Sequence, residues 1–334
     1  MIFAAEPHER CEARDYIKVL ASRGLPSRHM FSYRHAFHAG NHADVLKHMV
    51  LIATLKHLTQ KDSPIALFDT HAGAGLYRLD GDYAQTSGEA ANGFLRLGAP
   101  PSAAADGKKK PPIVPAPALQ DYIDMVASFN AKGSQKVYPG SPFIIQSLLR
   151  ERDKLKLFEL HPTDSKTLTA NIAQLEAGRQ VAVLREDGFE GLKKFLPPPQ
   201  RRAFVLSDPS YEIKADYSRV VATVGDALTR FATGTYAVWY PIIPRPEAHD
   251  VPRKLKTLAT KAGRSWLQAT LTVKNSKITT DATGEEHRPG LPASGMFVIN
   301  PPHTLKAVLQ AALPQLVELL GQDKHAQFTV EAGG

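Results

Sequence analysis

Three acidic residues stand at the ends of short, largely apolar candidate strands, which is where a doubly wound sheet binds its ligands. Asp69 opens a glycine-rich turn with Gly73 and Gly75, where a ligand can approach the backbone without meeting a Cβ atom. Glu159 and Asp187 end the next two runs; the first can accept both hydroxyls of a ribose, and the second an adenine amine. Together they favour a nucleoside-containing ligand, although a plain turn after Asp69 and helix capping by Glu159 or Asp187 are open alternatives.

The fourth apolar run ends in Asp208-Pro209-Ser210-Tyr211, which resembles the (D/N/S)PP(Y/F/W) motif of methyltransferases that modify exocyclic amines. Adenine N6 is a poor nucleophile because its lone pair is conjugated with the ring, so its hydrogens must be held and the base oriented. The Asp208 carboxylate and the Pro209 carbonyl can accept these hydrogens, and the Tyr211 ring can stack on the base. Ser210 replaces the usual second proline, which loosens the turn but removes no contacting group.

Further motifs follow one another in the order of one family. They are SYRHAFHAGNHADVLKH (32–48), FDTHAGAG (68–75), YPGSP (138–142), ELHP (159–162), EDGF (186–189), DPSY, FATGTYAVWYP (231–241) and ASGMFVINPP (293–302). The chain thereby resembles the bacterial J-type family, which methylates N6 of adenine 2030 in 23S ribosomal RNA. The first 29 residues and a Pro/Lys-rich loop depart from the family pattern, and neither falls on a motif.

The resemblance implies a Rossmann-like class I methyltransferase fold that uses S-adenosylmethionine. The cofactor contacts that it implies are His48, His71, Ser141, Glu159, Asp187 and Gly188. The glycine-rich turn adds Gly73 and Gly75 as expected cofactor contacts. The resemblance implies that Asp208 is the catalytic acceptor. Pro209, Tyr211 and Lys47 are the other expected catalytic residues. Tyr33, His35 and Lys47 would belong to an N-terminal tail that folds over the cofactor and helps to place the adenosine. The substrate would be a stem of naked or partly assembled 23S RNA.

The elements that must position these residues alternate between strands and helices. Apolar runs predict seven strands, at 65–69, 155–160, 180–187, 203–208, 235–241, 266–273 and 295–300. Helices are expected at 44–58, with Asp44 as its cap, and at 164–177, 216–231, 251–262 and 304–320. This alternation predicts an α/β fold with a seven-stranded doubly wound sheet, whose ligands bind at the carboxyl ends of the strands.

Four segments are expected along the chain. Residues 1–29 form a loose extension or precede the true start, and 30–76 hold the N-terminal tail and the first part of the main domain. Residues 77–135 form a small helical insertion with a Pro/Lys-rich loop at 98–118, and 136–334 complete the domain.

Composition narrows the class of protein. The 334 residues are 43% apolar and 22% charged, which is typical of a folded protein, and the net charge of +8 favours anionic partners such as nucleic acid. The single cysteine excludes an internal disulfide and fits the cytoplasm, and no apolar run is long enough to span a membrane. A monomer is expected. The basic residues expected to hold RNA phosphates near the site are Lys193, Lys194, Arg201, Arg202, Arg253, Lys254, Lys256, Lys261 and Arg264.

The same residues admit three other interpretations. His35, His38, His42 and His48 could suggest a metal site, but no supporting cysteine or His-x-x-x-His pattern accompanies them, and methyl transfer needs no metal. A DNA adenine-N6 methyltransferase would carry the same four-residue motif. A non-catalytic RNA-binding assembly factor could retain this fold if Ser210 had weakened the site.

Overall fold

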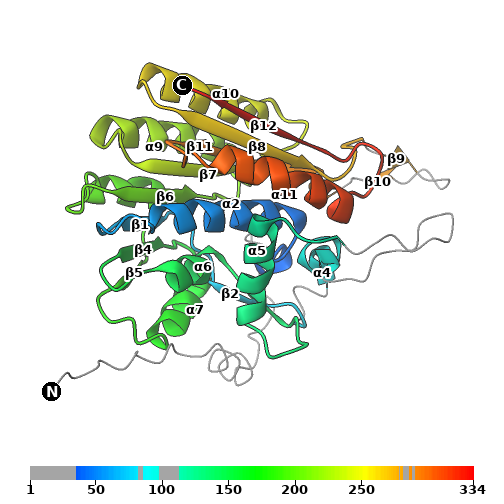
Figure 1. The fold of residues 1–334 in the computed structure, drawn as a ribbon, viewed down its shortest axis with the longest axis horizontal. Coiled ribbons are helices and arrows are strands. Elements are labelled where there is room, and N and C mark those ends of the chain that lie inside the picture. Colours follow the sequence, from blue (N-terminus) through cyan, green and yellow to red (C-terminus); the bar gives the residue numbers. More distant parts are fainter. Residues whose placement is uncertain (1–34, 82–85, 98–112, 278, 281–285, 288–289) are drawn as a thin grey trace.

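The computed structural model describes residues 35–81, 86–97, 113–277, 279–280, 286–287 and 290–334 (Figure 1). The expected extension 1–29, Tyr33 and most of the loop 98–118 lie outside these residues. Within the described residues no helix combines the length and the apolar content needed to cross a bilayer.

One eight-stranded sheet forms the centre of the molecule, with the strand order β12-β8-β11-β7-β6-β1-β4-β5. Its strands are β1 (Ala66–Asp69), β4 (Lys154–Phe158), β5 (Val181–Leu184), β6 (Ala203–Ser207), β7 (Thr235–Ile242), β8 (Trp266–Thr272), β11 (Ala293–Ile299) and β12 (Gln327–Gly333). The five strands from β5 to β7 are parallel, whereas β11 runs antiparallel to both β7 and β8. The doubly wound α/β class is therefore confirmed.

The prediction of seven strands was one short, because it omitted β12. This strand pairs antiparallel with β8 at the edge of the sheet. Most of its side chains are exposed or half-buried, so it lacks the apolar run that marks the interior strands. Among the described residues, two short two-stranded antiparallel sheets lie outside this sheet, formed by β2 (Leu76–Arg78) with β3 (Val137–Pro139) and by β9 (Thr279–Thr280) with β10 (Glu286–His287).

Helices cover both faces of the sheet. Alternate residues of a buried strand point to opposite faces, and Leu67 and Phe68 of β1 accordingly belong to two separate apolar clusters. One cluster includes side chains of α2 (His42–Leu58), α5 (Pro117–Ser128), α6 (Ser141–Leu148), α7 (Pro162–Ala173) and α11 (Leu305–Leu320). The other includes side chains of α8 (Gly188–Gly191), η3 (Leu192–Phe195), α9 (Asp216–Arg230) and α10 (Pro246–Lys261).

Helix α2 is the most enclosed helix of the site, since residues 42–52 are buried without interruption. It packs against α5, α6, α11 and β11, and Figure 1 shows it crossing the middle of the molecule. The helix begins at His42, because the Asn41 side chain accepts hydrogen bonds from the backbone N–H groups of Ala43 and Asp44. The prediction that Asp44 caps this helix was wrong, and its carboxylate is free for other contacts.

The segment between β2 and β3 contains η2 (Glu89–Asn92), α4 (Phe94–Leu97) and α5. Helix α5 packs on α2 and α11, and Leu119, Tyr122 and Val126 join the same apolar cluster as the main sheet. This segment is therefore helical and shares the core of the domain to which it is attached.

Candidate active site

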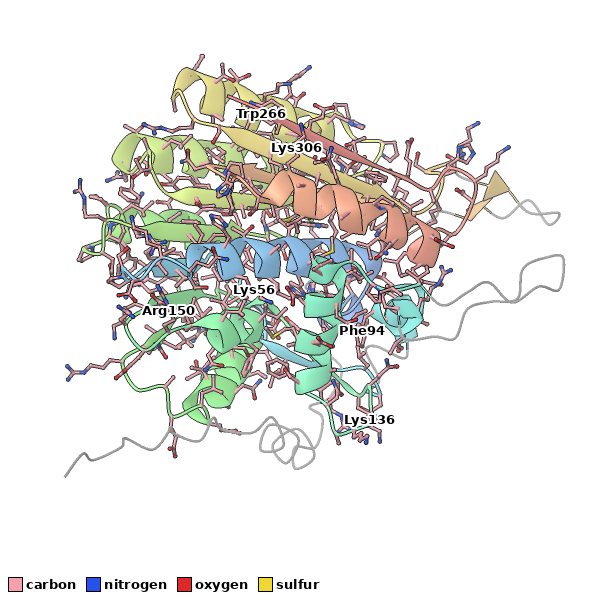
Figure 2. The ribbon with its side chains drawn as sticks, viewed as in Figure 1. Lys56, Phe94, Lys136, Arg150, Trp266 and Lys306 are labelled. Atoms are coloured by element: carbon pink, nitrogen blue, oxygen red, sulfur yellow. The ribbon has the colours of Figure 1, made fainter. Side chains whose placement is uncertain are left out.

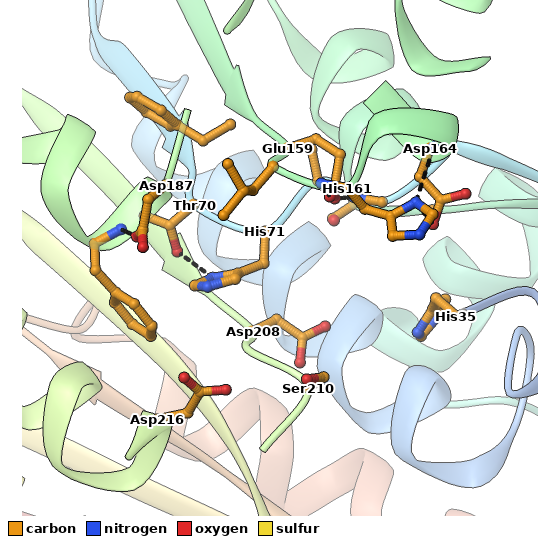
Figure 3. Close-up of a pocket in the computed structure, with 18 of the residues that line it drawn as sticks. His35, Thr70, His71, Glu159, His161, Asp164, Asp187, Asp208, Ser210 and Asp216 are labelled. Atoms are coloured by element: carbon orange, nitrogen blue, oxygen red, sulfur yellow. Dashed lines mark hydrogen bonds and ion pairs between the residues drawn. The ribbon is translucent and has the colours of Figure 1, made fainter. Parts of the chain in front are cut away.

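The carboxyl ends of β1, β4, β5 and β6 meet at one edge of the sheet, and Asp69, Glu159, Asp187 and Asp208 lie there. Glu159, Asp187 and Asp208 line a cavity of about 440 Å³, the first cavity, and Figure 3 shows them facing a common space. Asp69 is buried behind this cavity, where it contacts Ser141. This edge is where the strand pattern placed the ligand site.

A second cavity of about 720 Å³ adjoins the first. Both are lined by His35, Lys47, Asp208 and Ser210, so the two spaces meet at the end of β6. Aromatic and apolar side chains line much of the rest of the second cavity, including Tyr211, Tyr217, Trp239, Pro241 and Ile243. The site thus offers two adjoining compartments, with an acidic and a basic side chain at their junction.

Glu159 is held against the glycine turn of the first cavity. Its two carboxylate oxygens accept hydrogen bonds from the backbone N–H groups of Gly73 and His161, each at 2.7 Å. Gly73 has a φ of +60°, a conformation that favours glycine, and this brings its N–H to the carboxylate. Burial raises the pKa of Glu159 to about 7, so this group changes charge near neutral pH.

Asp187 combines helix capping with a charged partner. Its Oδ1 accepts the Phe189 N–H at 2.9 Å at the start of α8, while Oδ2 accepts from Arg219 at 2.6 Å. The Arg219 guanidinium also lies 4.5 Å from the centre of the Phe189 ring. Burial alone would raise the pKa of Asp187, but the hydrogen bond and charge of Arg219 hold it below its usual value.

Gly188 and Gly75 owe their identity to close packing. A Cβ atom on Gly188 would lie 1.9 Å from the Thr70 carbonyl oxygen, so only glycine lets α8 approach β1 at the cavity wall. Gly75 does not line either cavity; a Cβ there would lie 2.8 Å from side-chain atoms of Leu168 and Phe143. The turn thus places Gly73 at the first cavity and Gly75 in the packing behind it.

Ser141, His71 and His48 all line the first cavity. The Ser141 hydroxyl donates to Asp69 Oδ2 at 2.7 Å, and burial raises the pKa of Asp69 to about 6. His71 Nδ1 lies 2.8 Å from the Thr70 hydroxyl oxygen, and burial lowers the pKa of His71 to about 4. His48 Nδ1 lies 2.8 Å from the Tyr138 hydroxyl oxygen, while its Nε2 is buried with no partner among the described residues.

Lys47 joins two carboxylates at the junction of the cavities. Its ammonium lies 2.8 Å from Asp44 Oδ1 and donates a hydrogen bond to Asp208 Oδ2. Burial alone would lower the pKa of Lys47, but the two carboxylates raise it above its ordinary value, so the group is charged. Asp44 Oδ2 in turn lies 2.9 Å from His35 Nε2 and accepts the Gly40 N–H at 2.9 Å.

Pro209 and Tyr211 are more deeply buried than Asp208 and Ser210, with which they alternate along the chain. Tyr211 is 3% exposed, has a φ of +55° and donates its hydroxyl to the Trp239 carbonyl oxygen at 2.7 Å. Its ring lines the second cavity, with its centre 4.7 Å from that of Tyr217. Pro209 is buried and lines neither cavity, whereas Asp208 and Ser210 line both.

The four histidines of the N-terminal motif point to four separate partners. His35 contacts Asp44, His38 contacts Glu89, His42 contacts the Leu291 carbonyl oxygen and His48 contacts Tyr138. In the part of the chain that the structure describes, no group of three or more His, Cys, Asp or Glu side chains is arranged to hold a metal ion.

The expectation that basic clusters lie near the site was wrong for Arg201, Arg202, Lys261 and Arg264. These residues precede β6 or β8, two strands that run in the same direction, so they lie at the edge of the sheet opposite Asp208. Arg202 donates there to the Ser63 carbonyl oxygen. Lys256 stacks over Trp266 at the start of β8, which Figure 2 labels.

The other basic residues of that set have acidic neighbours. Lys193 and Lys194 pair with Glu190 and Glu186, and Arg253 and Lys254 both pair with Asp250. The exposed cation that does line the second cavity is Arg245, at the end of the loop after β7. It was not among the basic residues that the sequence predicted to hold RNA phosphates.

Three more residues were missed. Arg219 lies on α9 and reaches Asp187, Trp239 lies on β7 and lines the second cavity, and Asp44 bridges Lys47 and His35. Only Asp44 carried a sequence signal, because an i, i+3 spacing from Lys47 places both on one side of a helix.

Comparisons with known proteins agree on one family. A family model described as Ribosomal RNA large subunit methyltransferase D, RlmJ, matches residues 62–331. Ribosomal RNA large subunit methyltransferase J of Escherichia coli is 41% identical over 287 residues, which cover 86% of this chain and 93% of that protein. Its namesake from Haemophilus influenzae is 38% identical over 303 residues, covering 90% and 98%. A crystal structure of a Legionella pneumophila protein matches with a TM-score of 0.73 at 29% identity, covering 89% of this chain and 99% of that one.

Proposed function

Because the chain belongs to the ribosomal RNA large subunit methyltransferase J family, we propose that it transfers a methyl group from S-adenosylmethionine to N6 of an adenine in 23S ribosomal RNA. The observation that carries this proposal is the position of Asp208, which lines both cavities and is paired with Lys47. A carboxylate that can accept hydrogen bonds from an amine therefore lies where a methyl donor in one cavity would meet a base in the other.

The first cavity suits the cofactor by the chemistry of its lining. Glu159 can accept the ribose hydroxyls, and Asp187 with the Phe189 and Arg219 pair lies where an adenine can be bound. The Nε2 of His48, which is buried without a partner among the described residues, can provide a polar contact for the methionine part, next to Ser141. S-adenosylmethionine, when bound, supplies an electrophilic methyl group on a sulfonium.

The second cavity suits a base taken out of its stack. Its aromatic lining includes Tyr211 and Trp239, which can cover the faces of a base, and Arg245 at its rim can contact a phosphate. Adenine 2030, the target that the family resemblance implies, has to leave its stem to reach Asp208.

Asp208 is the acceptor for the amine in this proposal. Lys47 occupies Oδ2, so Oδ1 can accept one N6 hydrogen while the Pro209 carbonyl accepts the other. As the bond from N6 to the methyl carbon forms and the bond from that carbon to sulfur breaks, positive charge develops on N6. The carboxylate stabilises this charge, and the N6 proton then passes to Asp208 or to solvent.

Lys47 and His35 support this arrangement. The Lys47 ammonium pairs with Asp208 and fixes the orientation of its carboxylate, and His35 reaches both cavities from the segment before α2. The finer parts of the proposal are that a monomer acts in the cytoplasm, on naked or partly assembled 23S RNA, and that Tyr33 helps to place the adenosine.

Incubation of the protein with labelled S-adenosylmethionine and unmodified 23S RNA, followed by mass mapping, tests the proposal. We expect N6-methyladenosine at one position, a loss of about 10³-fold or more in rate for Asp208→Ala, and nearly unchanged cofactor binding. The matched control is Asp226→Ala, since Asp226 is an exposed aspartate on α9 that pairs with Arg230. Normal methylation by Asp208→Ala would refute the mechanism, and preference for duplex DNA would refute the substrate.

A further inference from the structure

Ser210 occupies the position where the motif usually has a second proline, and it lies where the two cavities meet. It lines both of them together with Asp208, and Figure 3 shows the two side chains close together on one loop. Its chain neighbours Pro209 and Tyr211 are buried, whereas Ser210 is half-buried. Its side chain therefore faces the space that a ligand would fill.

The Ser210 hydroxyl has no hydrogen-bond partner among the described residues, unlike the other polar groups at this junction. Lys47 and Asp208 pair with each other, and His35 contacts Asp44. A hydroxyl offers one donor and two acceptor positions. When a base fills the cavity and excludes water, an unpaired hydroxyl is unfavourable, so the bound base is expected to pair with it.

The edge of adenine has a group that suits a hydroxyl donor. N6 is flanked by the ring nitrogens N1 and N7, both of which accept hydrogen bonds. The Asp208 carboxylate offers acceptors, and Lys47 is directed at Asp208 and Asp44. Ser210, two residues after Asp208, can supply the donor that this edge requires, which a proline at this position lacks.

We propose that Ser210 Oγ donates a hydrogen bond to one of the two ring nitrogens that flank N6, and so helps to select and orient adenine. The inference rests on the proposed function and adds a specificity-determining contact to it. In this chain, the base is then recognised at its amine by Asp208 and at its ring by Ser210.

The test compares three RNA stems that carry adenine, 1-deazaadenine or 7-deazaadenine at the methylated position. For Ser210→Ala we expect kcat/KM on adenine to fall about tenfold. On the analogue that lacks the accepting nitrogen, kcat/KM of the wild type should fall by a similar factor, whereas kcat/KM of Ser210→Ala should not fall below its value on adenine. Ser210→Thr keeps the hydroxyl and should retain most of the activity.

Two controls separate this contact from other roles of Ser210. Ser210→Pro restores the usual motif without a hydroxyl. Its kcat/KM on adenine should equal that of Ser210→Ala if the hydroxyl matters, and should exceed it if only the conformation of the turn matters. Cofactor affinity should be unchanged in all variants.

Three results would overturn the inference. Ser210→Ala could have wild-type activity, or its kcat/KM could be reduced relative to the wild type by the same factor on all three stems. Ser210→Ala could also bind the cofactor more weakly while its kinetics with RNA are unchanged. A wild type that is inactive on adenine would instead refute the proposed function, and this inference with it.

Discussion

Asp44 gives the sharpest prediction, because one buried carboxylate holds three parts of the site. It is 1% exposed and contacts Lys47, His35 and the Gly40 N–H. Asp44→Asn keeps the size of the side chain but removes its charge. Since Lys47 retains Asp208 as a partner, the cost should lie at the lower end of that for breaking a buried ion pair, about 3 kcal/mol in the free energy of unfolding.

Urea unfolding at pH 7 measures this loss, with the slope expected to stay unchanged. Asp226→Asn is the matched control, because it removes a carboxylate from an exposed pair and should leave the free energy of unfolding near that of the wild type. If Asp44→Asn is as stable as the control variant, the buried network does not stabilise the fold and our reasoning is refuted.

The same prediction has a pH dependence with a definite sign. Burial alone would raise the pKa of Asp44, but His35, Lys47 and its hydrogen bonds hold it well below its usual value of 3.8. The ionised carboxylate therefore contributes all of its stability above pH 3.8, and this contribution is lost as the pH falls towards the pKa of the folded state. The difference in unfolding free energy between wild type and Asp44→Asn should narrow below pH 3.8; a constant difference would contradict the assignment.

Three further outcomes are expected. Gly188→Ala should weaken cofactor binding more than tenfold by calorimetry, since the new Cβ would displace the Thr70 backbone; unchanged affinity would contradict this. Because the pKa of Glu159 is raised to about 7, cofactor affinity should increase from pH 6 to pH 8 in the wild type and stay level in Glu159→Gln. Arg245→Ala should weaken RNA binding and lower its salt dependence, whereas Arg264→Ala, at the opposite edge of the sheet, should do neither.

Local patterns predicted most of the fold because they are written into short stretches of sequence. Strands β1, β5 and β6 are mainly apolar runs, and β4 is apolar apart from its two lysines, so Glu159 and Asp208 could be placed at strand ends without a structure. The exposed strand β12 has no such run, and its place in the sheet comes from pairing with β8. Edge strands are recognised by their partner, which the local sequence does not reveal.

The site was predictable in its residue types but not in its pairings. Lys47 and Asp208 are 161 residues apart, and only the folded chain brings their side chains together. The error over Arg201 and Arg264 has a different cause, since residues before a parallel strand and residues after it lie at opposite edges of the sheet. The stacking of Tyr211 on a base stays a prediction. In the structure, the Tyr211 ring is buried beside Tyr217.

The way in which α2 is anchored has a consequence for the synthesis of this enzyme. His42, at the start of the helix, contacts the Leu291 carbonyl oxygen, and His57, near its end, contacts Thr304. Both anchors are made about 250 residues later than the helix itself, as their separations of 249 and 247 show. A ribosome therefore exposes α2 long before the segments that anchor its two ends have been made, and the nascent chain should acquire activity only after those segments are complete.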